Sequence, residues 1–373
     1  MYLKVEFICL RGFVGYVLLD RLLQEKDFRD VAITFFSTSQ VGTNAPLNFA
    51  ATPYVQDAMD LKLLSSFDII LSCQGGDYSK NTLINLRNQS WDGFWIDAAS
   101  TFRMSNDSVI VLDPINKQMI EDGLHSGIKN YIGGNCTVTL MLMAIGNLFK
   151  YDLIEWVTSM TYQAASGAGA KQMLELVKQF SALSDSCREL IHQPTISSLT
   201  IDKQISKTLA SADFPNELFK APLAASLIPW IDSAVENGHT REEWKGMVET
   251  NKILQTNEMI PIDGLCVRIA AMRCHSQALT IKLKKNISTQ EIEAILAESN
   301  PWVKVIPNNQ EATLKELTPA AISGTLNIAV GRIKKLTLGE QYCAVFTVGD
   351  QLLWGAAEPL RRVLRMIVDF KNK

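Results

Sequence analysis

Residues 131–149 read YIGGNCTVTLMLMAIGNLF: two glycines, an asparagine, one cysteine and then an almost unbroken apolar run. The run from Cys136 to Phe149 predicts a buried helix, and the glycine pair predicts a tight turn before it. The pattern of the chain changes at this stretch, because short strands alternating with helices precede it and longer strands follow it. We therefore place the junction between two units of the fold here.

Size and composition limit the classes of protein that this chain can belong to. Its 373 residues exceed a typical single domain, so two domains are expected. The net charge is -3 and the longest basic run is IKLKK (281–285), which argues against nucleic acid and anionic membranes as partners. The opening residues lack a signal-peptide pattern, and the apolar run is too short to span a bilayer. Seven cysteines without framework spacing predict reduced thiols in the cytoplasm.

The first third of the chain predicts a parallel α/β sheet of the kind that binds a mononucleotide, because short apolar strands alternate with helical patterns. The predicted strands are 3–10, 31–36, 67–73, 93–97 and 109–112. The predicted helices are 14–26 and 79–87, the second with Ser79 as its N-cap.

The remainder predicts a second, mixed sheet with a closing helix. The predicted strands are 152–163, 264–272, 278–285 and 342–349. The predicted helices are 170–183, 240–254 and 351–370, and the polar stretch 193–220 is expected to be rich in loops. Thr240 and Glu243 have the spacing of a capping box at the start of the helix 240–254.

A dinucleotide site is predicted after the first strand, where the chain reads CLRGFVG. Gly12 and Gly15 fit the second and third glycines of a phosphate-binding turn, whereas Cys9 stands in place of the first. Arg11 in this turn, with hydroxyl residues at 37–39 where an NAD enzyme would carry an acid, favours the 2′-phosphate of NADP. The alternative is that the arginine and the hydroxyl run are solvated loop residues.

Cys136 is the candidate nucleophile. A helix N-terminus lowers the pKa of a thiol and offers free N–H groups to a developing oxyanion, so we expect an ionised, reactive sulfur. The alternative is a small buried residue, the usual fate of a free cysteine.

The segment RIAAMRCHSQ adds Arg268, which can bind a carboxylate with two hydrogen bonds, and His275, a candidate general acid/base. The two are seven residues apart and would face opposite sides of a flat strand. Both can reach one site only if the chain bends between them.

Two further segments carry candidate binding residues. Glu242 and Lys245 lie three apart on one helix face, where they can bind a substrate ammonium and a phosphate, or form only a solvated ion pair. Gln163 ends a strand and precedes a glycine-rich turn, a position for orienting substrate beside the cofactor, although the turn can also be a simple flexible loop.

Over essentially its whole length the chain resembles the aspartate-β-semialdehyde dehydrogenases of the Gram-negative bacterial type. The motifs that carry this resemblance are FFSTSQ, CQGGDY, WIDAAS, GGNCTV, TYQAASG, SLIPWID, EEWKGMVETNKIL, DGLCVR, RCHSQA and FTVGDQLLWGAAEPLRR.

The resemblance implies an α/β architecture with an N-terminal Rossmann-like parallel sheet and a second α+β domain built on a mixed sheet. The NADP-binding domain is expected over 1–133, completed by a C-terminal helix at about 355–373, and the catalytic and dimerisation domain over 134–354. The implied enzyme is a homodimeric, NADP-dependent, phosphorylating aldehyde dehydrogenase. It would interconvert aspartate semialdehyde and aspartyl phosphate on the route from aspartate to lysine, threonine, methionine and diaminopimelate.

The resemblance also implies roles for individual residues. Cys136 would be the nucleophile and His275 the acid/base, while Gln163 would orient a substrate whose carboxylate binds Arg268 and whose amino group binds Glu242. The implied phosphate ligands are Arg103, Asn135 and Lys245. The implied cofactor residues, with Gly15 from the turn, are Arg11, Gly12, Phe13, Val14, Thr38, Ser39, Gln74, Ser166, Gly167 and Gln351. No metal is implied.

The chain departs from the family pattern at Cys9 and at Ala168, where a glycine is common. We expect weaker cofactor binding from the first departure and no change of reaction. The alternatives are an N-acetylglutamyl-phosphate reductase, against which the charge of Glu242 argues, and a non-catalytic NADP-binding protein.

Overall fold

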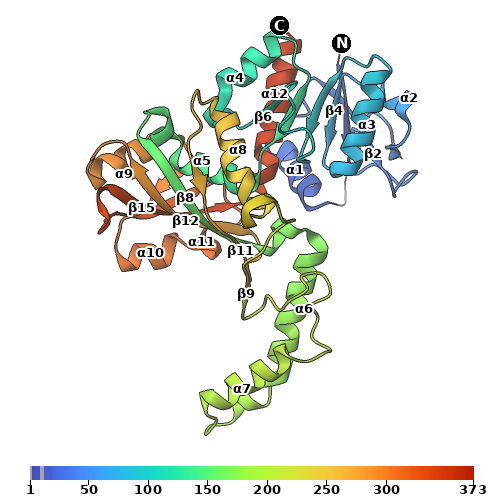
Figure 1. Cartoon of the computed structure of the whole chain (residues 1–373). Helices are drawn as coiled ribbons and strands as arrows, with labels where there is room; N and C mark the ends of the chain where they lie inside the picture. The colour runs from blue at the N-terminus through green and yellow to red at the C-terminus, as the bar shows by residue number, and fades with distance from the viewer. Residues whose placement is uncertain (1, 9–11) are drawn as a thin grey trace.

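The computed structural model describes residues 2–8 and 12–373. Two β-sheets with their covering helices form the body, and a helical arm projects from the second sheet (Figure 1). Among the described residues, no helix has the length and apolarity that a bilayer span needs.

The first sheet has seven strands in the order β3-β2-β1-β4-β5-β7-β6, and all of their pairings are parallel. Its strands are β1 (Leu3–Ile8), β2 (Val31–Ser37), β3 (Gln56–Asp57), β4 (Ile69–Ser72), β5 (Phe94–Asp97), β6 (Ser108–Val111) and β7 (Asn130–Gly133). The predicted parallel α/β sheet is confirmed.

Helices cover both faces of the first sheet. One face packs on α1 (Phe13–Gln24), α4 (Asp113–His125) and α12 (Glu358–Lys371), and the other on α2 (Leu61–Leu64) and α3 (Gly76–Asn88). Since α12 is the last helix of the chain, the C-terminus returns to the core of the first sheet (Figure 1).

The second sheet is mixed, as predicted, with the order β13-β14-β15-β12-β8-β11-β9 and β10 paired to β8. Its strands are β8 (Ile154–Gln163), β9 (Leu227–Ile228), β10 (Ile262–Asp263), β11 (Cys266–Ile269), β12 (Cys274–Leu283), β13 (Val303–Val305), β14 (Ile328–Leu336) and β15 (Gly339–Asp350). Its helices are α5 (Cys136–Lys150), α6 (Ala170–Cys187), α7 (Ser198–Leu209), α8 (Arg241–Leu254), α9 (Thr289–Ala297), α10 (Gln310–Glu316) and α11 (Pro319–Ile322).

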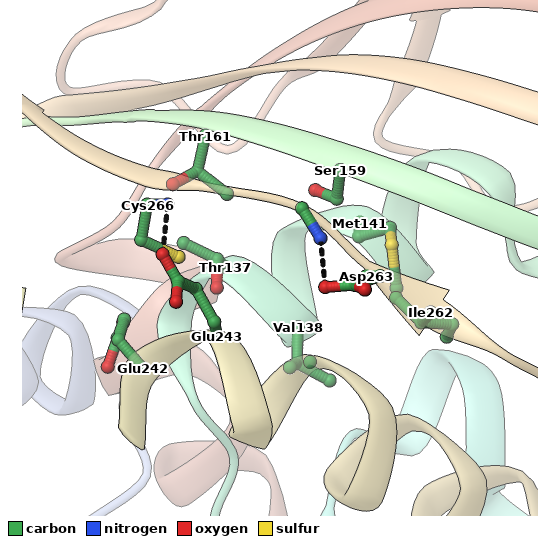
Figure 2. Close-up of a pocket in the computed structure, with 12 residues that line it drawn as sticks. Thr137, Val138, Met141, Ser159, Thr161, Glu242, Glu243, Ile262, Asp263 and Cys266 are labelled. Carbon is green, nitrogen blue, oxygen red and sulfur yellow. Dashed lines mark hydrogen bonds between the residues drawn. The ribbon is translucent and has the colours of Figure 1, made fainter. Parts of the chain in front are cut away.

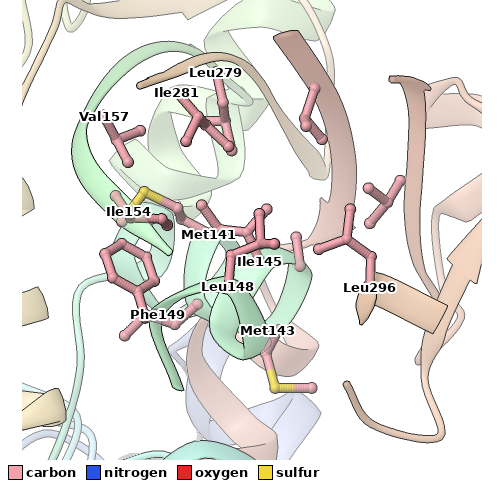
Figure 3. Packing of buried hydrophobic residues seen from close by; sticks show 14 of the residues in the cluster. Met141, Met143, Ile145, Leu148, Phe149, Ile154, Val157, Leu279, Ile281 and Leu296 are labelled. Atoms are coloured by element: carbon pink, nitrogen blue, oxygen red, sulfur yellow. The ribbon is translucent and has the colours of Figure 1, made fainter. Parts of the chain in front are cut away.

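The helix α5 is the centre of the second core. Every residue from 137 to 149 is buried, so the helix is apolar on all sides, as its sequence predicted. Figure 3 shows Met141 and Ile145 of α5 packed together with Leu279 and Ile281 of β12 and Leu296 of α9. This packing fixes the position and direction of the helix, and with it the place of its first residue.

Three details of the predicted elements are wrong. The stretch 193–220 contains the helix α7, which Ser197 caps and which packs on α6 to form the arm. The helix α3 begins at Gly76, so Ser79 lies inside its first turn and donates to the carbonyl of Gly75 instead of capping it. The predicted closing helix is two elements, a π-helical turn at Leu353–Ala357 followed by α12.

Glu6 on β1 is a buried carboxyl without a partner. Its side chain is fully buried, and neither oxygen has a hydrogen bond within the described part of the chain. Burial raises its pKa well above the usual value, so folding favours the neutral form of this acid. The carboxyl therefore costs free energy of folding.

We expect Glu6→Leu to stabilise the protein by about 1–3 kcal/mol at pH 8, because it removes an unsatisfied polar group of similar size. Above its ordinary pKa, Glu6 ionises in the unfolded chain, whereas burial opposes its ionisation in the folded protein. The wild type therefore loses stability as pH rises, and the gain from Glu6→Leu is expected to shrink towards pH 4. Urea unfolding at both pH values measures this. Glu6→Gln, which keeps a buried polar group, should gain less, and a variant less stable than wild type at pH 8 would refute the assignment.

Candidate active site

A cavity of about 460 Å³ lies where α1, α5, α8 and the ends of β8 and β11 meet. The predicted site residues that line it are Val14, Arg103, Asn135, Cys136, Gln163, Gly167, Glu242, Lys245, Arg268 and Gln351. His275 lies behind the cavity wall, fully buried. Residues distant in the sequence, from both sheets, therefore converge on one space.

The first turn of α5 presents the sulfur. Asn135 is the N-cap, and its side-chain oxygen accepts hydrogen bonds from the N–H groups of Thr137 at 3.0 Å and Val138 at 3.3 Å. Cys136 is thereby the first residue of the helix, and its Sγ lies 3.2 Å from Nε2 of His275. The thiol and the imidazole form a direct pair.

Arg268 and His275 reach the same site because they belong to two different strands. Arg268 on β11 is in register with Gln163 of β8, and the chain then passes the end of β8 and returns as β12 on its other side. The predicted continuous strand 264–272 is therefore wrong, and the bend that the site requires is present. The backbone of Ala164 contacts both residues. Its N–H donates to Nδ1 of His275 at 3.0 Å, and its carbonyl accepts from Nη1 of Arg268 at 2.8 Å.

The predicted capping box starts α8 and orients its acidic residues. Thr240 and Glu243 bond each other's backbone N–H groups, and Glu243 also accepts from the N–H of Cys266. Figure 2 shows Glu243 turned towards Cys266, with Glu242 separate from it on the neighbouring part of the helix. Glu243 thus belongs to the capping box, whereas Glu242 and Lys245 line the cavity.

Glu242 and Lys245 form a buried ion pair and not a solvated one. Nζ of Lys245 lies 2.9 Å from Oε2 of Glu242, and both residues are less than a tenth exposed. The other oxygen of Glu242 accepts from Nδ2 of Asn135 at 3.0 Å and from Nε2 of Gln163 at 3.1 Å. Although burial opposes it, these partners hold the pKa of Glu242 below its usual value, so the carboxylate is charged.

Arg268 differs from the other cations of the cavity. Arg103 is paired with Glu249, and Lys245 is paired with two carboxylates, whereas within residues 2–8 and 12–373 Arg268 takes part in no ion pair. Arg268 is 6% exposed, and the one hydrogen bond of its side chain in the described part of the chain is to a carbonyl. A buried guanidinium without a counter-ion is suited to bind an anionic group of a ligand.

Comparisons with known proteins agree with this geometry. Residues 4–123 match the family model described as semialdehyde dehydrogenase, NAD binding domain, and residues 145–354 match the model described as semialdehyde dehydrogenase, dimerisation domain. The solved structure of aspartate semialdehyde dehydrogenase from Francisella tularensis is 50% identical over 98% of this chain and 99% of that chain, with a TM-score of 0.93. This chain belongs to the aspartate semialdehyde dehydrogenase family.

More distant members of the family share the fold. The structure of aspartate semialdehyde dehydrogenase II from Vibrio cholerae, complexed with ASA, is 22% identical with a TM-score of 0.78 and covers 99% of both chains. The enzyme from Candida albicans, solved with NADP, is 14% identical with a TM-score of 0.65 and covers 100% of this chain and 99% of that one. The expected family is confirmed, and with it an oxidoreductase that acts on an aldehyde.

Two opposing effects act on the ionisation of the Cys136 sulfur. Burial, and next the carboxylate of Glu242, raise the pKa of Cys136 to about 12, and the nearby cations Arg268, Arg103 and Lys245 offset only part of this rise. Burial and then Arg268 lower the pKa of His275 to about 3. Burial therefore opposes the ionisation that the helix start is predicted to favour, because loss of hydration acts against the helix dipole.

Alkylation of the free protein tests this charge state. A thiol whose pKa is about 12 is protonated at neutral pH, so its thiolate fraction rises about tenfold for each pH unit. We expect the rate of iodoacetamide modification at Cys136, followed by peptide mass spectrometry, to rise about 100-fold from pH 7 to pH 9. A rate already on a plateau between these values would show an ionised sulfur and contradict the raised pKa.

One group of predicted cofactor residues in the described chain lies at the carboxyl ends of strands of the first sheet. Gly12, the N-cap of α1, follows β1, Thr38 follows β2 and Gln74 follows β4, so they stand at the ends of three adjacent parallel strands. Nε2 of Gln74 donates to Oγ1 of Thr38 at 3.0 Å, across the end of β1. The remaining members of this group are Phe13, Val14, Gly15 and Ser39. Arg11 and Cys9 lie outside the described residues.

A second group of predicted cofactor residues comes from the second sheet. Gln351 donates from Nε2 to Oγ of Ser166 at 2.7 Å, and Gly167 and Gln351 line the cavity. The cavity thus extends from Val14 at the start of α1 to Cys136 at the start of α5. Val14 from the first group and Gly167 and Gln351 from the second therefore line one cavity.

Two residues with direct contacts in the site were not identified from the sequence. Glu249 accepts from the N–H of Asn135 at 2.7 Å and from Nη1 of Arg103 at 3.0 Å, and Asp232 accepts from Nζ of Lys245 at 2.8 Å. The spacing of Glu249 after Lys245, four positions on the same helix face, could have identified it. Asp232 lies in a loop, where no periodicity indicates direction.

Proposed function

We propose that this chain is an NADP-dependent, phosphorylating aspartate semialdehyde dehydrogenase, in which Cys136 carries the acyl group as a thioester. The observation that carries the proposal is the pair of Cys136 Sγ and His275 Nε2, beside a cavity lined by the buried carboxylate of Glu242 and by Arg268, which has no ion-pair partner among residues 2–8 and 12–373. An α-amino acid carries a carboxylate, which matches the guanidinium, and an ammonium, which matches the carboxylate of Glu242. With both bound, an aldehyde on its side chain would lie against the sulfur.

The binding groups favour an amino acid with a free ammonium. Arg268 would take the substrate carboxylate and Glu242 the ammonium, while Gln163, whose Nε2 donates to Glu242, would orient the two. An N-acetylated substrate has no charge to offer the buried carboxylate of Glu242, which disfavours an N-acetylglutamyl semialdehyde as substrate.

Cys136 and His275 would then carry the covalent step. Because the N–H of Ala164 donates to Nδ1, the neutral imidazole of His275 holds its proton on Nε2, beside the sulfur. The thiol first gives its proton to water, and the resulting thiolate adds to the aldehyde. The Nε2–H of His275 and the N–H of Cys136 can then donate to the oxygen that becomes negative in this step. Loss of hydride from this adduct leaves a thioester on Cys136.

Two glycines pack closely against the catalytic pair, beside the cavity in which a nicotinamide would bind. A Cβ on Gly355 would lie 2.9 Å from Cβ of Cys136, and a Cβ on Gly167 would lie 2.8 Å from Nη1 of Arg268 and 3.3 Å from Nε2 of His275. Glycines at both positions therefore let the backbone pack closely on Cys136, Arg268 and His275, and the cavity beside them extends to Val14 in the first turn of α1. The nicotinamide of the bound cofactor supplies hydride transfer. The hydroxyls of Thr38 and Ser39 at the end of β2, with Arg11, support NADP over NAD.

Phosphate would complete the reaction. Arg103, Asn135 and Lys245 surround the part of the cavity next to Cys136 and would hold the phosphate whose oxygen attacks the thioester and releases the thiolate. The product is aspartyl phosphate. The reverse direction supplies the semialdehyde for the synthesis of lysine, threonine, methionine and diaminopimelate.

We also propose a homodimer. The arm carries unburied apolar side chains in a stripe at helical spacing on α6, where Leu174, Val177 and Phe180 are 57%, 48% and 42% exposed. Such a stripe is typical of a surface that a second copy covers. The cytoplasm is the proposed compartment, because no disulfide joins the cysteines of the described chain.

The deciding experiment measures NADPH formation from aspartate semialdehyde with and without phosphate. We expect turnover to require both, to prefer NADP to NAD, and to be negligible with N-acetylglutamate semialdehyde. Equal rates without phosphate would refute the phosphorylating reaction, and equal rates with the acetylated aldehyde would refute the role of Glu242.

A further inference from the structure

Lys245, the proposed phosphate ligand, is already bound by two carboxylates. Its Nζ lies 2.9 Å from Oε2 of Glu242 and 2.8 Å from Oδ2 of Asp232. Although burial opposes it, these two carboxylates raise the pKa of Lys245, so the ammonium is charged. Two negative groups therefore surround one positive group at the place where a phosphate anion is expected to bind.

The two carboxylates are held very differently. The side chain of Glu242 is 7% exposed, and its second oxygen is anchored by Asn135 and Gln163 from two other elements. The side chain of Asp232 is 33% exposed, and apart from Lys245 its hydrogen bonds in the described chain come only from the N–H and hydroxyl of the next residue, Ser233. Glu242 is therefore fixed, whereas Asp232 has only local support.

The backbone at Asp232 also favours exchange. Asp232 lies in the exposed loop between β9 and α8, with a φ of 73°, a left-handed conformation that residues other than glycine rarely adopt. Although burial opposes it, the bond from Lys245 holds the pKa of Asp232 below its usual value, so the side chain is anionic at neutral pH. The loop thus presents a charged group that can leave Lys245 without disturbing a helix or a strand.

We propose that Asp232 is a built-in competitor for the phosphate site: its carboxylate occupies Lys245 until phosphate displaces it, and so sets the affinity of the enzyme for phosphate. This inference rests on the proposed function, which places phosphate at Lys245. A dianion entering beside Asp232 would meet like charge within a few ångströms, in a cavity that screens charge less than water does. Displacement frees one donor of Lys245 and removes that repulsion at the same time.

The test is the phosphate KM of Asp232→Asn in the NADPH-forming assay. The substitution removes the charge of Asp232 and keeps the shape of its side chain. We expect the phosphate KM to fall roughly three- to tenfold, because a partly exposed ion pair contributes about this much in free energy. The KM for aspartate semialdehyde should change by less than twofold, since Arg268 and Glu242 are untouched. Calorimetric titration of the same proteins with inorganic phosphate should give the same ratio without turnover.

Two further variants make the outcome decisive. Asp92→Asn makes the same change of charge at another aspartate paired with a lysine, Lys129, remote from the cavity, and should leave the phosphate KM unchanged. Lys245→Gln should raise it strongly. If Lys245→Gln raises the phosphate KM but Asp232→Asn leaves it unchanged or raises it, Asp232 only positions Lys245 and does not compete with phosphate, and the inference is overturned. If Lys245→Gln has no effect, the proposed phosphate site is wrong, and this inference with it.

Discussion

Cys136→Ala is expected to lower kcat by ~10⁶-fold, close to the background reaction, because no other group can form the thioester. Cys136 is the cysteine whose sulfur contacts His275, at 3.2 Å, and it is the first residue of the helix α5. The affinity for NADPH should remain within a few-fold of wild type, since alanine fits in the same space. Steady-state NADPH formation and fluorescence titration with NADPH measure the two effects separately.

A matched control is Cys187→Ala. Cys187 is a buried cysteine near the end of α6, outside the cavity, and its loss should leave kcat within about twofold of wild type. If Cys136→Ala kept more than about one per cent of wild-type turnover, sulfur could not be the nucleophile, and the proposed mechanism would fail.

Arg268→Leu is expected to lower kcat/KM for aspartate semialdehyde roughly 30- to 3,000-fold, because the substrate carboxylate loses a buried, charged partner. The guanidinium is 6% exposed and has no ion-pair partner in the described chain, so the substrate would supply its missing counter-ion. The measurement is kcat/KM for aspartate semialdehyde and for 3-aminopropanal, the same aldehyde without the carboxylate.

The second aldehyde separates recognition from damage to the fold. Arg268 also bonds the carbonyl of Ala164, so its loss can disturb His275, but that disturbance should affect both aldehydes equally. The wild type should prefer the carboxylated aldehyde, and Arg268→Leu should lose most of that preference. Arg268→Lys should retain part of this preference, because lysine keeps the positive charge but cannot donate two parallel hydrogen bonds to a carboxylate. An undiminished preference in Arg268→Leu would exclude Arg268 from carboxylate binding.

Local patterns in the sequence were sufficient for much of this molecule. The alternation of strands and helices predicted the parallel sheet, and the run after Cys136 predicted the helix α5, because both patterns depend only on which face of an element is buried. The capping box of Thr240 and Glu243 was predicted in the same way, from contacts within one helical turn. Whole-length motifs then indicated the family.

Contacts between distant segments required the folded chain. The seven-residue separation of Arg268 and His275 became compatible with one site only because β8 lies between their strands, a pairing that local spacing does not specify. The ion pair between Asp232 and Lys245 connects a loop to a helix, and no sequence periodicity predicts such a contact. Cys136 is the clearest case: the helix start that favours a thiolate is a local feature, whereas the burial that raises the pKa of this thiol is a sum over side chains brought together from the whole chain.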